Sequence, residues 1–144
     1  MELSQAVVAG DRRCLARALT LIENHPVEAR SMMSELLAHA GCSQLIGVTG
    51  PPGCGKSTLV SGLVQRFRSL GQTVGILAVD PSSRITHGAI LGDRVRMRDL
   101  AGDPGVFIRS MATRGILGGL ARSTSEAAII MDAAGFDRVA IETV

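Results

Sequence analysis

The sequence predicts an α/β fold with a largely parallel sheet. Short apolar runs without polar alternation, typical of strands covered on both faces, occur at 45–50, 73–79 and 138–144. Stretches of helical length, at 56–70 and 120–134, separate these runs. Strands that alternate with helices are the pattern of a parallel sheet flanked by helices, and 144 residues fit a single fold of this size.

The first part of the chain is predicted to be helical. Residues 3–40 carry apolar side chains at helical spacing, interrupted by Asn24-His25-Pro26, and Gly41 is suited to end the second helix. We therefore expect a helical hairpin over 1–42, in front of a main domain over 43–144.

The main domain is predicted to continue as strand, helix, strand and so on to its end. In the helix at 56–70, Leu59, Leu63, Val64 and Phe67 share one side. The remaining predicted elements are a loop at 80–92, a short helix at 93–101, a strand at 106–108, a glycine-rich stretch at 110–119, a helix at 120–134 and a strand at 138–144.

Composition excludes several function classes. Net charge is +2 without a block of basic residues, and aromatic residues make up 2% of the chain, so neither a nucleic-acid surface nor a base-stacking platform is expected. No apolar stretch is long enough to span a bilayer, and residues 1–14 lack the pattern of a secretory signal. We expect a cytoplasmic protein without a nucleic-acid or membrane partner.

A phosphate-binding motif lies between the first predicted strand and its helix. The sequence GPPGCGKS at Gly50–Ser57 matches GxxxxGK[ST], whose glycines let backbone N–H groups approach a phosphate. We expect Lys56 to reach the β- and γ-phosphates of a nucleoside triphosphate and Ser57 to bind Mg²⁺. The predicted nucleotide-binding residues are Gly50, Pro51, Pro52, Gly53, Cys54, Gly55, Lys56, Ser57 and Thr58.

Three acidic residues are candidate magnesium ligands. Asp80 follows the strand at 73–79, Glu142 lies near the end of the strand at 138–144, and Asp93 follows the loop at 80–92. Carboxyl ends of parallel strands meet at one edge of a sheet, so Asp80 and Glu142 face the phosphate loop if their strands are neighbours. An ordinary loop carboxylate, or for Asp93 a helix cap, is the alternative.

Four segments together resemble the methylmalonyl-CoA mutase-associated GTPases, the MeaB/ArgK/MMAA group. The segments are GVTGPPGCGKSTL, ILAVDPSSRITHGAILGDRVRM, FIRSMATRGILGGLA and AAGFDRVAIETV. The resemblance implies a P-loop GTPase that assists loading and protection of an adenosylcobalamin-dependent mutase, with GTP hydrolysis as the switch. It implies catalytic roles for Lys56, Asp80 and Glu142, and a magnesium set of Ser57, Asp80, Asp93 and Glu142.

The same resemblance implies a longer protein. Family members continue after ETV with a second switch region and an NKxD motif that reads guanine, whereas this chain ends at Val144. We therefore expect the N-terminal part of an incomplete G domain, weak hydrolysis by this part alone, and a homodimer for the whole protein. The choice of GTP over ATP is implied by the resemblance only.

Two other functions remain open from the residues. A small-molecule kinase, as in the older arginine/ornithine transport-system label, would need an acceptor site and a basic lid, for which Arg109 and Arg114 are candidates. A non-catalytic binding module, docking through an exposed sheet edge, is the second alternative.

Overall fold

The computed structural model describes residues 2–80, 98–112 and 122–143. Its helices are α1 (Leu3–Val8), α2 (Arg12–Asn24), α3 (Ala29–Leu37), α4 (Lys56–Ser69), α6 (Arg98–Ala101) and α7 (Arg122–Ala133). Its strands are β1 (Gln44–Thr49), β2 (Val74–Asp80), β3 (Val106–Ala112) and β4 (Arg138–Thr143). The predicted α/β fold is confirmed, and β3 is longer than the three residues that the sequence indicated.

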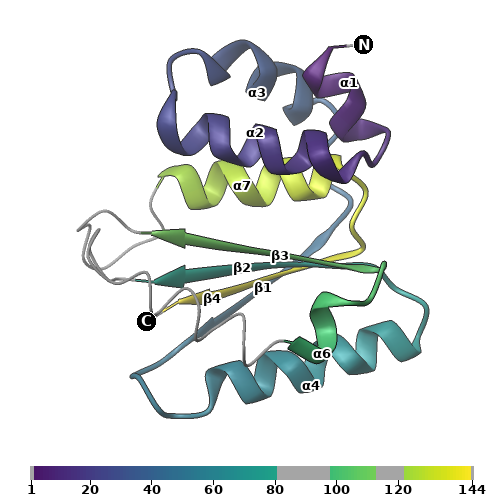
Figure 1. Ribbon diagram of the computed structural model, residues 1–144, viewed down its shortest axis with the longest axis vertical. Helices are drawn as coiled ribbons and strands as arrows, with labels where there is room; N and C mark the ends of the chain where they lie inside the picture. Colours follow the sequence, from purple (N-terminus) through teal and green to yellow (C-terminus); the bar gives the residue numbers. More distant parts are fainter. Residues whose placement is uncertain (1, 81–97, 113–121, 144) are drawn as a thin grey trace.

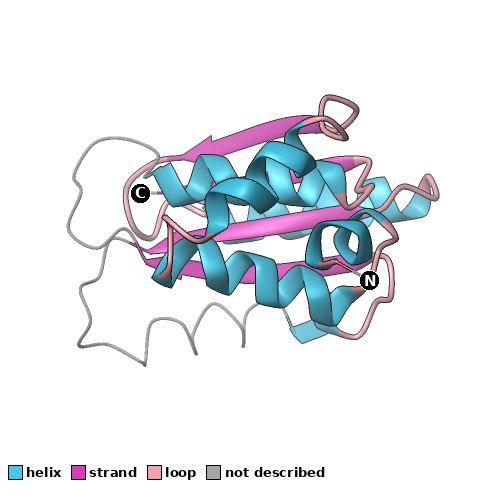
Figure 2. Cartoon of the chain, turned by 90° about the horizontal axis from the view of Figure 1, so that it is seen from above, coloured by secondary structure: helices cyan, strands magenta, loops and turns pink. Residues whose placement is uncertain are grey.

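The four strands form one parallel sheet in the order β1-β4-β2-β3. Figure 1 shows α4 and α6 on one face of this sheet and α7 on the other, and Figure 2 shows the strands from above with helices lying over them. β4 pairs with β2, so the strands that carry Glu142 and Asp80 are neighbours, as the candidate metal site requires.

Helix α4 covers one face of the sheet. Val60 and Val64 are fully buried against Val74 and Ile76 of β2 and residues of β3 and β4. Leu59 was expected on this packed side, but its side chain is 54% exposed. Because successive residues are about 100° apart around a helix, the side that places Val60 on the sheet leaves Leu59 on the flank.

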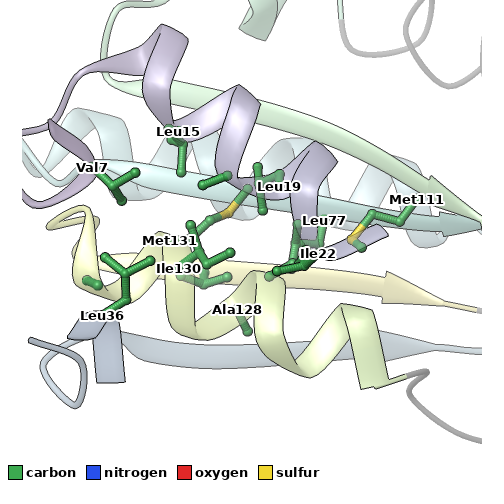
Figure 3. Close-up of a cluster of buried hydrophobic side chains, with 14 of the residues drawn as sticks. Val7, Leu15, Leu19, Ile22, Leu36, Leu77, Met111, Ala128, Ile130 and Met131 are labelled. Carbon is green, nitrogen blue, oxygen red and sulfur yellow. The ribbon is translucent and has the colours of Figure 1, made fainter. Parts of the chain in front are cut away.

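The opposite face carries two layers of helices. α7 packs on the sheet, and α1, α2 and α3 pack on α7, so that the predicted N-terminal hairpin is a unit of three helices. Asp11 caps α2 by accepting the backbone N–H groups of Arg13 and Cys14. Apolar side chains of all these helices meet those of β2 and β3 in one cluster (Figure 3), so the N-terminal helices share a core with the sheet.

β1 corrects one expectation from the sequence. Its apolar run predicts a strand covered on both faces, but β1 is an edge strand of the described sheet, and Leu45 is 55% exposed. Apolar composition reports the environment a strand is suited to, and it does not say which neighbouring elements are present.

None of the helices that the structure describes has the length and apolar character needed to cross a membrane.

Candidate functional site

The phosphate loop joins the carboxyl end of β1 to the first turn of α4. Gly53 and Gly55 have φ angles of 78° and 94°, in the left-handed region that glycine adopts without a steric cost. Gly55 is the N-cap residue of α4, and no side chain caps the helix there. The first N–H groups of α4 therefore keep the positive end of the helix available to an anion.

Lys56 folds back over this loop. Its ammonium Nζ donates to the carbonyl oxygens of Gly50, at 2.8 Å, and Pro51, at 3.0 Å. The positive charge is thus held directly above the loop whose N–H groups would surround a phosphate. Within the loop, the Cys54 Sγ lies near Gly50, where an added Cβ atom would be only 3.0 Å from the sulfur.

Ser57 and Glu142 meet behind the loop. The Ser57 hydroxyl donates to Glu142 Oε1 at 2.7 Å, which joins the first turn of α4 to the end of β4. Glu142 is 9% exposed, and its second carboxylate oxygen, Oε2, is buried without a hydrogen-bond partner. A buried carboxylate oxygen without a donor is costly unless a cation or water satisfies it. Because Mg²⁺ prefers hydroxyl and carboxylate oxygens, these two residues fit the ion.

The other two acidic candidates are placed less completely. Asp80 ends β2, where its backbone lies opposite Ala112 of β3 and two positions beyond the Ala78–Glu142 pair. Asp93 lies outside the described residues. Among the residues that the structure does describe, no group of three or more His, Cys, Asp and Glu side chains could hold a metal. The four-residue magnesium set therefore stays a prediction.

Arg109, a candidate for a kinase lid, contacts helix α2 in the structure. Its Nη2 contacts Glu23 Oε2 and Thr20 Oγ1 of α2, so the guanidinium is engaged with the N-terminal helices. Arg114, the other lid candidate, lies outside the described residues. Sequence reasoning missed the contact between Arg109 and α2 because it joins residues 86 positions apart.

Comparison with known proteins places this sequence in a family. Residues 15–144 match the family described as methylmalonyl Co-A mutase-associated GTPase MeaB. The chain belongs to this family. The expected resemblance is thereby confirmed, and it covers the phosphate loop, Asp80 and Glu142.

Curated relatives of this MeaB-family chain come from distant organisms. A Pyrococcus abyssi protein, whose name assigns it provisionally to the GTPases, is 50% identical over 99% of the chain and 44% of its own length. GTPase ArgK of Escherichia coli is 40% identical over 94% and 42%. The mouse mitochondrial methylmalonic aciduria type A homolog is 36% identical over 99% and 38%. The chain spans less than half the length of each.

A solved structure supports the fold. The crystal structure of a protein titled LAO/AO transport system kinase superposes with a TM-score of 0.76 at 27% identity, covering 99% of this chain and 42% of that one. The MeaB-family chain therefore corresponds to part of a larger molecule in both kinds of comparison.

Proposed function

We propose that this chain binds GTP and GDP at Gly50–Ser57 and forms part of a GTPase that hydrolyses GTP to GDP and phosphate. The observation that carries the proposal is the Ser57–Glu142 contact directly behind a phosphate loop, with a carboxylate oxygen left unpartnered. Membership of the MeaB family and the GTPase names of relatives support guanine nucleotide as the ligand.

Hydrolysis transfers the γ-phosphoryl group to water. The bond between the γ-phosphorus and the bridging oxygen breaks, a new phosphorus–oxygen bond forms to water, and a proton is released at neutral pH. Little covalent chemistry is asked of the protein, because positioning and charge neutralisation supply most of the rate. Lys56 would neutralise charge on the β- and γ-phosphates, and the N–H groups of the loop and α4 would fix their position.

We infer that Ser57, Asp80, Asp93 and Glu142 would hold Mg²⁺, directly or through water. The ion would supply a positive charge beside the β- and γ-phosphates. Glu142 is buried against Ser57 in the structure, so its carboxylate is already oriented by the Ser57 hydroxyl at the start of α4. Thr58 is exposed at the start of α4, where it would meet the α-phosphate.

The biological role proposed for the whole protein is assistance to an adenosylcobalamin-dependent methylmalonyl-CoA mutase, in cofactor loading or protection. The family description and the name of the mouse relative support this partner. We further propose a cytoplasmic homodimer for the whole protein. Because the chain spans less than half of its relatives, we expect it to bind nucleotide but to hydrolyse GTP slowly when alone.

A titration with a fluorescent GTP analogue tests the proposal, and the chain has no Trp or Tyr to interfere with the signal. We expect Mg²⁺-dependent binding that unlabelled GTP displaces, and loss of binding in Lys56→Ala. Failure of unlabelled GTP to displace the analogue would contradict GTP as a ligand of this chain. Binding that Lys56→Ala leaves unchanged would contradict the phosphate-loop site.

The destination of the phosphate distinguishes hydrolysis from the kinase alternative. With γ-labelled GTP, we expect label to appear as free phosphate, in small amounts for this chain. Label on an added small-molecule acceptor would instead support a kinase. Arg109, one of the two arginines that kept the kinase alternative open, is engaged by Glu23 and Thr20 of α2.

A further inference from the structure

Side chains near both ends of helix α2 contact β3, an edge strand of the described sheet, or the residues just before it. Arg12, the first residue of α2, donates to the carbonyl oxygens of Pro104, at 2.6 Å, and Val106. Its guanidinium also lies over the ring of Phe107, with Cζ 5.4 Å from the centroid. Near the other end of the helix, Glu23 pairs with Arg109. Figure 1 shows α2 on the same side of the sheet as α7.

The Arg109–Glu23 pair is partly buried and incompletely satisfied. The two side chains are 24% and 18% exposed, and Arg109 Nη2 also lies 3.2 Å from Thr20 Oγ1, one turn earlier on α2. Arg109 Nε is buried without a partner. Buried ion pairs seldom add net stability, and a leftover buried donor reduces it further. The pair is therefore more important for the position of β3 than for the stability of the fold.

The pair contacts the middle of β3, three residues before the end of the strand that lies beside the nucleotide edge. Arg109 is three residues before Ala112, and Ala112 pairs with Asp80 at the end of β2. Two residues back along the same strands, Ser110 pairs with Ala78, which in turn pairs with Glu142. A displacement of β3 along its axis would break this backbone ladder or carry β2 and Asp80 with it.

We propose that Arg109 and Glu23 are positioning residues for the nucleotide site. Their contact makes α2 a support that sets the position of β3 and, through the strand ladder, the position of β2, whose last residue is Asp80. This inference rests on the proposed function. It predicts that the α2–β3 contact and Mg²⁺–nucleotide binding are energetically coupled, and such coupling acts equally in both directions.

Removing the Arg109–Glu23 pair should weaken nucleotide binding, although neither residue is predicted to contact the nucleotide. Glu23→Gln keeps the size of the side chain and one acceptor oxygen but removes the charge that faces Arg109. Mutations that act through such a network typically change coupling by an amount that corresponds to a three- to tenfold change in affinity, as a rough guide. We expect the dissociation constant for a fluorescent GDP analogue with Mg²⁺ to rise by about this factor.

The chain provides a matched control at the opposite end of β3. Arg68 and Asp103 form a pair with similar exposure, 25% and 28%, and with Nε–Oδ2 at 2.9 Å. Asp103 lies just before β3, at the end of the sheet away from the phosphate loop. Asp103→Asn should lower the denaturation midpoint as Glu23→Gln does, but it should leave nucleotide affinity within about twofold of the unmodified chain, the limit of additivity for independent sites.

A double-mutant cycle completes the test. Nucleotide affinity and denaturation midpoint are measured for the unmodified chain, Glu23→Gln, Arg109→Gln, the double variant and Asp103→Asn. We expect each single variant of the pair to weaken binding three- to tenfold and the double variant to be no weaker than either. If Arg109→Gln does not fold, Arg109→Lys, which keeps charge but loses the planar fork, replaces it and should give an intermediate loss.

Two outcomes overturn the inference while leaving the proposed function intact: unchanged affinity in Glu23→Gln, or an equal loss of affinity in Asp103→Asn. Failure of the unmodified chain to bind nucleotide would refute the proposed function, and the inference with it.

Discussion

Replacing Glu142 by Gln tests whether the buried carboxylate serves a metal or the fold. The variant keeps an acceptor for the Ser57 hydroxyl, now 2.7 Å from Oε1, but replaces an unpartnered, buried, charged oxygen by a neutral amide. Two opposing terms determine stability without metal. A charge no longer has to be buried, which stabilises the chain, whereas the hydrogen bond from Ser57 weakens and a buried NH₂ group lacks an acceptor, at about 1–3 kcal/mol.

These terms are of similar size, so we expect the free energy of unfolding without metal to change by no more than about 1 kcal/mol. Binding should respond differently, because the magnesium set loses a carboxylate. Changes next to a metal typically cost about 10- to 100-fold in affinity, or about 1.4–2.8 kcal/mol. The variant should therefore need much more Mg²⁺ to bind nucleotide.

Urea denaturation in a chelator gives the first quantity, and nucleotide titration at stepwise Mg²⁺ concentrations gives the second. Glu35→Gln is the control, because Glu35 also accepts a serine hydroxyl, from Ser4, but within the N-terminal helices. The reasoning is refuted if Glu142→Gln lowers metal-free stability by more than about 3 kcal/mol, the scale of a broken buried pair, while its Mg²⁺ requirement is unchanged.

Three further predictions concern the phosphate loop, the Asp132 carboxylate that binds the backbone at 41–43, and the core. Gly55→Ala places a side chain at a φ of 94°, so we expect a loss of about 1–3 kcal/mol in urea denaturation together with weaker nucleotide binding; full binding would show that this conformation is not required. Asp132 accepts the N–H groups of Gly41, Cys42 and Ser43, and although burial opposes the shift, these bonds lower its pKa. Its contribution is therefore present above the unfolded pKa of about 4 and is lost as the pH falls through the lower folded value, and Asp132→Asn should flatten the acid limb of unfolding free energy against pH. Leu19→Ala, at a fully buried position, should cost about 2–5 kcal/mol in the same assay, and a loss below 1 kcal/mol would contradict its place in the core.

The elements near the phosphate loop were predictable because their signals are local. The motif at Gly50–Ser57, the helix that follows it and the carboxyl-end position of Glu142 can each be recognised within a short window of sequence. The parallel sheet follows from the alternation of elements, and its strand order then brings Glu142 to Ser57. The roles of these residues in binding and catalysis stay predictions.

Properties that depend on distant neighbours were not predictable. The exposure of β1 depends on which strands lie beside it, and Leu45 has the same identity in a covered and an uncovered strand. The pairing of Arg109 with Glu23 joins the middle of β3 to a helix of the N-terminal layer. No local sequence pattern around Arg109 or Glu23 indicates that the two residues pair, so the contact becomes evident only from the packing of α2 beside β3.

Hydrogen–deuterium exchange with and without Mg²⁺ and GDP tests the central claim most directly, because it locates the ligand along the chain. We predict slower exchange of the backbone N–H groups at 53–58 when nucleotide is bound, together with the end of β4 at Glu142 and Thr143. Lys56→Ala should show no such change. Protection elsewhere, with exchange at 53–58 unaltered, would contradict a nucleotide site at the phosphate loop.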